Sequence, residues 1–219
     1  MLAVNPKMAE IELQTIYLNK IKEALARLNA CISFLTHHQT NNDPYMLDAA
    51  VLQARKAMEA VAFAAIAPNR SEYEKFRSAA EKPADYRKDY NARAILQHLG
   101  KINSDFYPTP LLAPAKNAAG GWHFERKSGD FLTKKQFESF YDRLGKYLHA
   151  DNPWGNDKAV QNLKSDLPGV IKSLQSLLEW HFTVIRTPDF NGVWVIEASF
   201  KGTPPRVIVG KADGEFVVQ

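Results

Sequence analysis

The sequence has a single cysteine, Cys31, and no apolar run long enough to cross a membrane. A single cysteine excludes an intramolecular disulfide and is compatible with a reducing compartment. The first residues also lack a basic region followed by an apolar core and a small-residue cleavage site, which are the features of a secretory signal. The sequence therefore predicts a soluble cytoplasmic protein without membrane contact.

Common catalytic and cofactor motifs are missing as well. The sequence has no glycine-rich phosphate loop, no dinucleotide-binding fingerprint and no Gly-x-Ser-x-Gly motif. His37 and His38 are neighbours, so on a helix their side chains point about 100° apart and cannot share a metal ion. Cys31 lies beside Ile32 and close to Phe34 on an apolar helical pattern, which predicts a buried, unreactive thiol. We therefore predict neither a cofactor nor a metal site.

The composition is otherwise that of an ordinary folded protein. Hydrophobic residues make up 45% of the 219 residues and charged residues 24%, so the chain can bury a sizeable core. The formal net charge is +4, and the sequence pI is near 9.0. This mild positive charge is compatible with an RNA or DNA partner but does not require one.

Apolar residues recur every three or four positions along most of the chain, as is typical of helices that bury one face. In the first helix this stripe consists of Leu18, Ile21, Leu25, Leu28, Ile32 and Leu35. Helix starts are indicated by Asp43 with Pro44, Ser71 with Glu74, Pro83, and Thr133 with Gln136. The predicted helices cover residues 9–38, 44–67, 71 onward, 83–100, 133–149 and 157–181, the last kinked by Pro168.

After His181 the apolar residues alternate with a period of two, which predicts short strands. These strands are expected at residues 182–185, 193–200, 206–211 and 215–218. Residues 101–130 are rich in proline and glycine and have no regular pattern, apart from a small hairpin expected across Ser128-Gly129. We predict a mainly α fold: a helical bundle over residues 1–181, with an irregular loop at 101–130, and a small antiparallel β meander over residues 182–219 packed on it.

Three residues near the end of the helix predicted at 133–149 could carry chemistry. Arg143, Lys146 and His149 are spaced three residues apart, so they form one slanted ridge on that helix. Histidine can take up and release a proton near neutral pH, and arginine offers a planar cation that fits a phosphate. Metal-free RNA cleavage needs a base that removes the proton of the 2′-hydroxyl and a cation that stabilises the pentacoordinate phosphate. These three residues are therefore candidate catalytic residues.

The segment from Arg143 to His149 resembles the Arg-x4–6-His motif of the HEPN superfamily. This resemblance implies a helical bundle and a homodimer in which the motifs of both protomers face one cleft. Many members of this superfamily are metal-independent ribonucleases of toxin–antitoxin and antiphage systems, so the resemblance implies RNA as substrate and an antitoxin as partner. Arg55 and Glu59 followed by Val61-Ala62-Phe63, together with the segment from Leu148 to Pro153, also resemble a group of uncharacterised bacterial proteins of similar length, which implies no activity.

The candidate residues also have structural interpretations. His149 could bond a free carbonyl at the helix end, and Arg143 could pair with a carboxylate at the surface. Arg55 and Glu59 are four residues apart on an alanine-rich helix, where they could form an ion pair that joins two helices. Alternatively, Glu59 could orient His149 across the bundle.

A basic and aromatic segment is a further candidate for nucleic-acid binding. Arg87, Lys88 and Arg93 are interleaved with tyrosines, which could stack on the bases of a single strand while the cations contact its phosphates. Neighbouring aspartates and glutamates dilute the positive charge, so a solvated surface is the alternative.

The leading hypothesis is a metal-independent RNA-cleaving protein of the HEPN type, or an inactive relative, that acts as a homodimer. Arg143 would steady the phosphate, His149 would act as general acid or base, and Lys146 would contact the RNA backbone. The alternative is a non-enzymatic module that binds another protein through the β tail and the 101–130 loop. Two features favour the alternative: the modest net charge, and Leu144, which follows Arg143 where HEPN proteins usually carry a polar residue.

Overall fold

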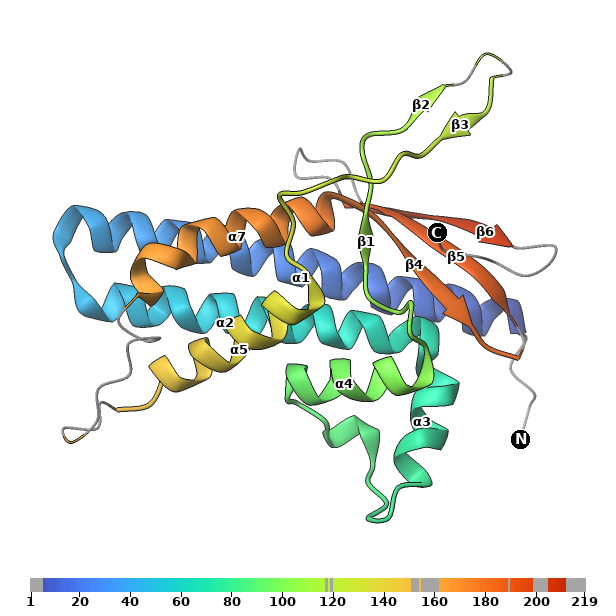
Figure 1. Ribbon diagram of the computed structural model, residues 1–219, viewed down its shortest axis with the longest axis horizontal. Helices are drawn as coiled ribbons and strands as arrows, with labels where there is room; N and C mark the ends of the chain where they lie inside the picture. Colours follow the sequence, from blue (N-terminus) through green and yellow to red (C-terminus); the bar gives the residue numbers. More distant parts are fainter. Residues whose placement is uncertain are drawn as a thin grey trace.

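The computed structural model describes residues 6–116, 118, 120–150, 154, 162–188, 190–198 and 205–211, with side chains from residue 10 onward. A long antiparallel helix pair runs through the molecule, with shorter helices along it and a small sheet across one end (Figure 1). Within these ranges, no helix combines the length and the apolar character that crossing a bilayer requires.

The central helix pair consists of α1 (Pro6–Asn41) and α2 (Pro44–Ile66). Asp43 caps α2, because its carboxylate accepts a hydrogen bond of 2.9 Å from the backbone N–H of Tyr45. Pro44 occupies the first helical position, where its missing N–H costs nothing. The predicted start of this helix is confirmed.

The buried stripe of α1 follows the predicted positions with one difference. Most of the predicted residues are buried, but Ile32 is 42% exposed and its neighbour Cys31 is fully buried in its place. Burial raises the pKa of the Cys31 thiol to about 12. The predicted burial of this thiol is confirmed.

Two short helices, α3 (Arg70–Ser78) and α4 (Ala92–Ile102), pack beside the central pair. The predicted start of α3 is wrong. A 3-10 turn at Ala67–Asn69 leads directly into α3, so Ser71 lies inside the helix and is not its N-cap. The turn lets the chain pass from α2 to α3 without the break that the capping-box pattern predicted.

The predicted bounds of α4 are also wrong at both ends. Asn91 caps the helix through a hydrogen bond of 3.0 Å from the N–H of Ala94, so the helix does not begin at Pro83. Gly100 does not end the helix, which continues to Ile102.

Helices α5 (Lys134–Tyr147) and α7 (Leu163–Glu179) complete the helical layer. Thr133 and Gln136 form the predicted capping box: each side chain accepts a hydrogen bond from the backbone N–H of the other. Pro168 lies within α7, as predicted. The predicted beginning of that helix at Asp157 lies outside the described residues.

Within the described residues, one antiparallel sheet has the strand order β1-β4-β5-β6. The strands are β1 (Thr109–Pro110), β4 (Trp180–Arg186), β5 (Asn191–Glu197) and β6 (Arg206–Lys211). The consecutive pairing of β4, β5 and β6 confirms the predicted meander, while β1 joins it from the 101–130 segment. The strand predicted at 215–218 lies outside the described residues.

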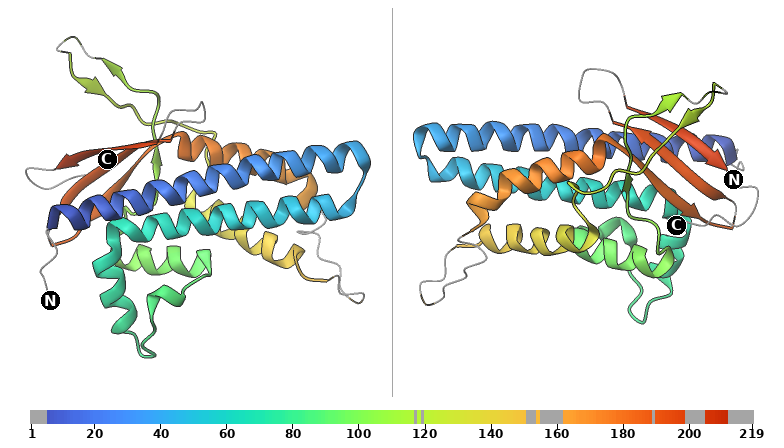
Figure 2. Two further views of the ribbon diagram at one scale, coloured as in Figure 1. Left: turned by 180° about the vertical axis from the view of Figure 1, so that it is seen from behind. Right: turned by 45° about the horizontal axis from the view of Figure 1, so that its top comes forward.

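Two further strands, β2 (Ala115–Lys116) and β3 (Trp122–His123), pair as a hairpin that projects from the body (Figures 1 and 2). The hairpin predicted across Ser128-Gly129 is wrong, because β3 pairs with the preceding strand. Gly129 adopts a φ of 71° and belongs to the turns that lead into α5. We call residues 111–127 the arm.

The helices and the sheet share the main hydrophobic core. Ile185, Trp194 and Ile196 of the sheet belong to the same buried cluster as the helices. On the opposite face of the sheet, a smaller cluster joins Phe182 and Val184 to the base of the arm. The predicted fold class, mainly helical with a C-terminal antiparallel sheet, is confirmed. The division near residue 181 into a bundle domain and an appendage stays a prediction.

Candidate functional site

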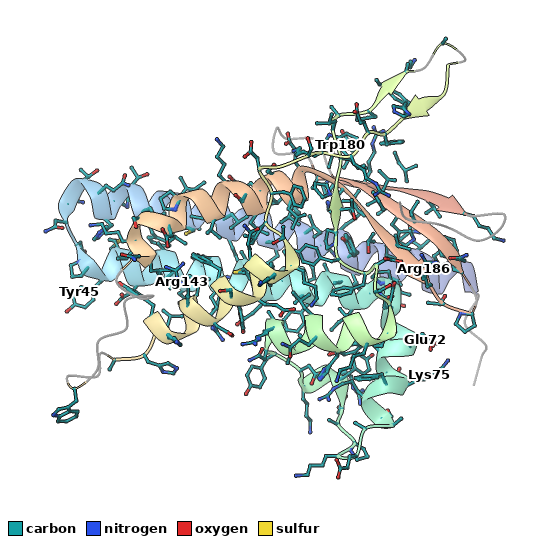
Figure 3. The ribbon with its side chains drawn as sticks, in the orientation of Figure 1. Tyr45, Glu72, Lys75, Arg143, Trp180 and Arg186 are labelled. Carbon is teal, nitrogen blue, oxygen red and sulfur yellow. The ribbon has the colours of Figure 1, made fainter. Side chains whose placement is uncertain are left out.

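Arg143 lies on the flank of α5, beside the start of α7 (Figure 3). Its Nη2 donates a hydrogen bond of 2.8 Å to Oδ2 of Asp166 in the first turn of α7, and its guanidinium lies over the ring of Phe140. The side chains of Arg143 and Asp166 are 23% and 45% exposed, so solvent screens their ion pair. A cation is thus held at a defined position within reach of solvent.

The next residue, Leu144, is fully buried in the face that α5 turns toward the core. Phe137, Phe140 and Tyr141 belong to the same face. Packing therefore explains why an apolar residue follows Arg143 at this point of the motif.

His149 lies just past the end of α5 instead of on the helix. The helix ends at Tyr147, and the N–H of His149 donates to the carbonyl of Lys146 at 3.2 Å, a tightened last turn. The helical ridge is therefore regular only from Arg143 to Lys146. The imidazole of His149 is exposed, and no hydrogen bond of its side chain is seen with any described residue. Asn152, in the segment that resembles uncharacterised bacterial proteins, is a further candidate to support this site, and it lies outside the described residues.

Arg55 and Glu59 join α2 to α5, which is the structural interpretation of this pair. Arg55 Nη2 donates to Oη of Tyr141 at 2.8 Å, and Tyr141 Oη donates to Oε1 of Glu59 at 3.0 Å. Nε of Arg55 lies 3.3 Å from Oε1 of Glu59. Burial, helped by the charge of Glu59, raises the pKa of Tyr141 to about 12, so its phenol remains a donor at neutral pH. Among the described residues, no hydrogen bond links Glu59 to His149.

Gly145, between Arg143 and Lys146, makes room for Arg55. A Cβ atom built on Gly145 would lie 2.4 Å from Nη1 of Arg55. Only glycine lets this guanidinium rest against the backbone of α5, where Nη1 also donates to the carbonyl of Tyr141 at 3.3 Å. Arg55, from the central helix pair, therefore holds the part of α5 that carries the candidate motif.

A groove of about 670 Å³ separates the outer faces of α5 and α7. Arg143 lies on its α5 wall, and Asp166 on its α7 wall. The remaining lining residues are Leu132, Lys135, Gln136, Ser139, Phe140, Ser165, Gly169, Val170 and Ser173. Sequence reasoning missed this groove, because the groove depends on how α5 and α7 pack against the central helix pair.

The basic residues predicted to bind nucleic acid lie on two elements. Arg87 lies in a 3-10 turn at Tyr86–Lys88 and pairs with Asp85 at 2.8 Å, and Lys88 beside it is exposed. Arg93, at the start of α4, donates to the carboxylate of Asp142 on α5. Arg93 thus contacts the helix that carries Arg143, whereas the ion pair of Arg87 lies within its own turn.

A buried histidine was not recognised from the sequence. Nδ1 of His181 lies 3.1 Å from the carbonyl oxygen of Leu178, which can only accept, so Nδ1 carries the proton. Nε2 therefore accepts the hydrogen bond of 2.8 Å from Oη of Tyr17. Burial lowers the pKa of His181 to about 4, so the ring is neutral at physiological pH. Its position at the border of the helical and strand patterns was the available signal, and its role is to pack the sheet on α1.

A second polar cluster ties the 3-10 turn at Tyr86–Lys88 to α3. Asp89 accepts hydrogen bonds from Oη of Tyr73 at 2.8 Å and from the guanidinium of Arg77 at 2.8 and 2.9 Å. His98 lies beside them, with its pKa lowered by burial and by the charge of Arg77. The carboxylate is fully engaged within the fold, so this cluster holds a loop in place.

In the part of the chain that the structure describes, no group of three or more histidine, cysteine, aspartate or glutamate side chains is arranged to hold a metal ion. Comparison with known proteins finds no family model, no curated protein and no solved structure that this chain matches.

Proposed function

We propose that this protein is a cytoplasmic, metal-independent endoribonuclease of the HEPN type, or an inactive relative of such enzymes, with its site at the C-terminal end of α5. One observation carries the proposal. Arg143, held between Asp166 and the ring of Phe140, lies six positions before an exposed imidazole, that of His149. Between them, Lys146 presents a second exposed cation.

Each residue has a defined task in this proposal. The imidazole of His149 removes the proton of a 2′-hydroxyl, and the oxygen then attacks the adjacent phosphate. The P–O5′ bond breaks as the 2′,3′-cyclic phosphate forms, and the leaving 5′-oxygen takes a proton from the imidazolium or from water. Arg143 donates to the non-bridging oxygens as charge builds on the pentacoordinate phosphate, for which a planar guanidinium is suited. Lys146 contacts a neighbouring phosphate. Arg55, through Tyr141 and the backbone beside Gly145, positions the helix that carries these groups.

A homodimer would bring two such sites together in one cleft, as the resemblance to HEPN proteins implies. An exposed histidine that no described residue orients is a weak general base, and a second protomer could supply both the orientation and a second acid–base group. The same resemblance suggests a toxin or defence protein that an antitoxin restrains.

The test is RNA degradation by the purified protein in excess EDTA. His149→Ala and Arg143→Ala should each abolish cleavage, while the matched controls His37→Ala and Arg206→Ala, at exposed positions elsewhere, should retain it. Cleavage that survives both site substitutions would refute the assignment of these residues. Cleavage by none of the proteins would favour an inactive relative or the second candidate.

The arm supports a second candidate function, a non-enzymatic protein-interaction module. The arm is anchored at its base, where Lys127 lies 3.7 Å from Glu179 and Phe124 packs against Trp180 (Figure 3). Its outer part carries Trp122, which is 58% exposed, with the ammonium of Lys116 over the indole. Exposed tryptophan is costly in water and is enriched at protein interfaces.

A photo-crosslinking residue at position 122 tests this candidate in cells of the source organism. One crosslinked partner, in a constant molar ratio to this protein, would support the candidate if it is absent when the same residue replaces the exposed Tyr90. Equal crosslinking patterns from both positions would refute it.

A further inference from the structure

The groove between α5 and α7 has walls of complementary character. On α5, Lys135, Ser139 and Arg143 follow one another in steps of four residues, so they lie along one line of the helix. On α7, Ser165, Gly169 and Ser173 show the same spacing and face them across the groove. The α5 wall thus carries cations and a hydroxyl, and the α7 wall carries small residues beside the carboxylate of Asp166.

Apolar side chains lie between these walls. Leu132 and Phe140 are almost fully buried, and Val170 is partly buried, yet all three line the groove. At Gly169 an added Cβ would meet no atom within 4 Å, so the groove is open at this point. A volume of about 670 Å³ lies within the range of sites that hold small organic ligands.

We infer that this groove binds one nucleotide of an RNA strand, with the base against the apolar residues and the phosphate at Arg143. The groove offers apolar contact, a cation and hydrogen-bonding groups, and a ribonucleotide has a matching base, phosphate and ribose hydroxyls. The carboxylate of Asp166 accepts hydrogen bonds from the ribose hydroxyls. The serine hydroxyls on both walls form hydrogen bonds with the polar edges of the base.

The ion pair in the groove is compatible with this exchange of partners. Arg143 and Asp166 neutralise each other at 2.8 Å, and their exposure of 23% and 45% keeps the pair weak. A phosphate can therefore take the guanidinium at little cost while the carboxylate turns to the ribose.

Lys135 and Arg143 contact different phosphates. They are two helical turns apart, about 12 Å along the axis, which is too far for one phosphate to bridge both ammonium and guanidinium closely. Lys135 is exposed at the far end of the groove from Arg143. It is therefore placed for the next phosphate of a strand whose other phosphate lies at Arg143.

The inference deepens the proposed function, on which it rests for the identity of the polymer. With the nucleotide in the groove and its phosphate at Arg143, the scissile bond lies toward His149. The groove then selects the nucleotide beside the cleavage point. Binding of free nucleotides can be measured whether or not the protein cleaves RNA.

Isothermal titration calorimetry with ribonucleoside 5′-monophosphates, adenosine and inorganic phosphate tests the groove. We expect saturable binding of at least one monophosphate, weaker binding of adenosine and of phosphate, and a loss of about tenfold or more in Gly169→Phe, which fills the groove. The control Gln97→Phe adds the same ring at an exposed position of α4 without changing charge and should bind normally. Adenosine 3′,5′-bisphosphate should bind more tightly than the monophosphate, and Lys135→Ala should remove this gain.

The inference would be overturned if no monophosphate bound saturably, or if wild type and Gly169→Phe bound with equal affinity. Inorganic phosphate binding as tightly as the nucleotides would also overturn it, because the apolar part of the groove would then contribute nothing. The proposed function fails separately. If nucleotides bind in the groove but RNA stays intact in EDTA, nucleotide binding by the groove is supported and the nuclease activity is refuted. If RNA is cleaved equally by wild type and Gly169→Phe, the nuclease activity is supported and the role of the groove is refuted.

Discussion

Replacing Gly145 with alanine should destabilise this protein, although the same change inside a helix normally stabilises. A glycine in a helix interior costs about 1 kcal/mol relative to alanine. At this position, however, the new Cβ would lie 2.4 Å from Nη1 of Arg55, which is closer than side-chain atoms approach. The guanidinium would have to move away from α5.

The cost follows from what Arg55 would lose. It donates to the carbonyl and the hydroxyl of Tyr141 at 3.3 and 2.8 Å, and its guanidinium lies 4.1 Å from the centre of that ring. Hydrogen bonds from a charged group contribute about 2 kcal/mol each in partly buried sites. Loss of one such bond outweighs the gain of about 1 kcal/mol from alanine, so the net loss is about 1 kcal/mol. That corresponds to a fall of about 3 °C in Tm for a chain of this size.

Thermal denaturation and urea titration measure the change. Gly169→Ala is the matched control, because its Cβ meets no atom within 4 Å, and it should raise Tm by about 3 °C. In an Arg55→Ala background, Gly145→Ala should also become stabilising, which a double-mutant cycle would reveal. If Gly145→Ala raised Tm as much as Gly169→Ala in the wild type, Arg55 would not rest against α5 and the anchoring of the motif would be refuted.

Three further predictions follow from single contacts. Thr133→Ala should cost about 1 kcal/mol by removing the cap of α5, whereas Ser71→Ala should change the free energy of unfolding little; equal effects in urea titrations would contradict the assigned caps. Burial lowers the pKa of His181 to about 4, below the 6.5 of the unfolded chain, so the unfolded state binds more protons and stability should fall as pH drops from 6.5 toward 4, by up to about 3 kcal/mol. His181→Gln should flatten this part of the stability profile, and an unchanged slope would refute the burial of a neutral ring. Asp166→Asn should cost under about 1 kcal/mol of stability. It should also strengthen RNA binding in filter assays, because the amide oxygen still accepts from the ribose hydroxyls but no longer competes with the phosphate for Arg143, and weaker binding would argue against a phosphate at that arginine.

Much of the fold could be predicted because its signals are local. The capping box of Thr133 and Gln136 and the Asp43 cap depend on residues within one helical turn, and both are seen as predicted. The change from a helical to an alternating pattern near His181 likewise marks the passage from α7 to β4. The wrong boundaries have local causes too: the Ser71 pattern was overridden by a helix that continues through a 3-10 turn.

The candidate site was predicted only in its residue types. The spacing of Arg143 and His149 was visible in the sequence, but a helical pattern does not show that α5 ends at Tyr147 and leaves the histidine past the helix. Nor does it show which carboxylate meets the arginine. Asp166 follows 23 residues later, on another helix, and only the packing of both helices on the central helix pair brings the two charges together.

The sequence by itself therefore determined the long helices, most of the faces that they bury and the C-terminal meander, because hydrophobic periodicity and caps act between near neighbours. The tertiary structure alone decided the contacts between those segments. Arg55 reaches Tyr141 across 86 residues, and Tyr17 reaches His181 across 164. Neither pair has a signature in the chain, because a polar group that enters a core accepts whichever partner the packing of the surrounding apolar faces places within hydrogen-bond distance.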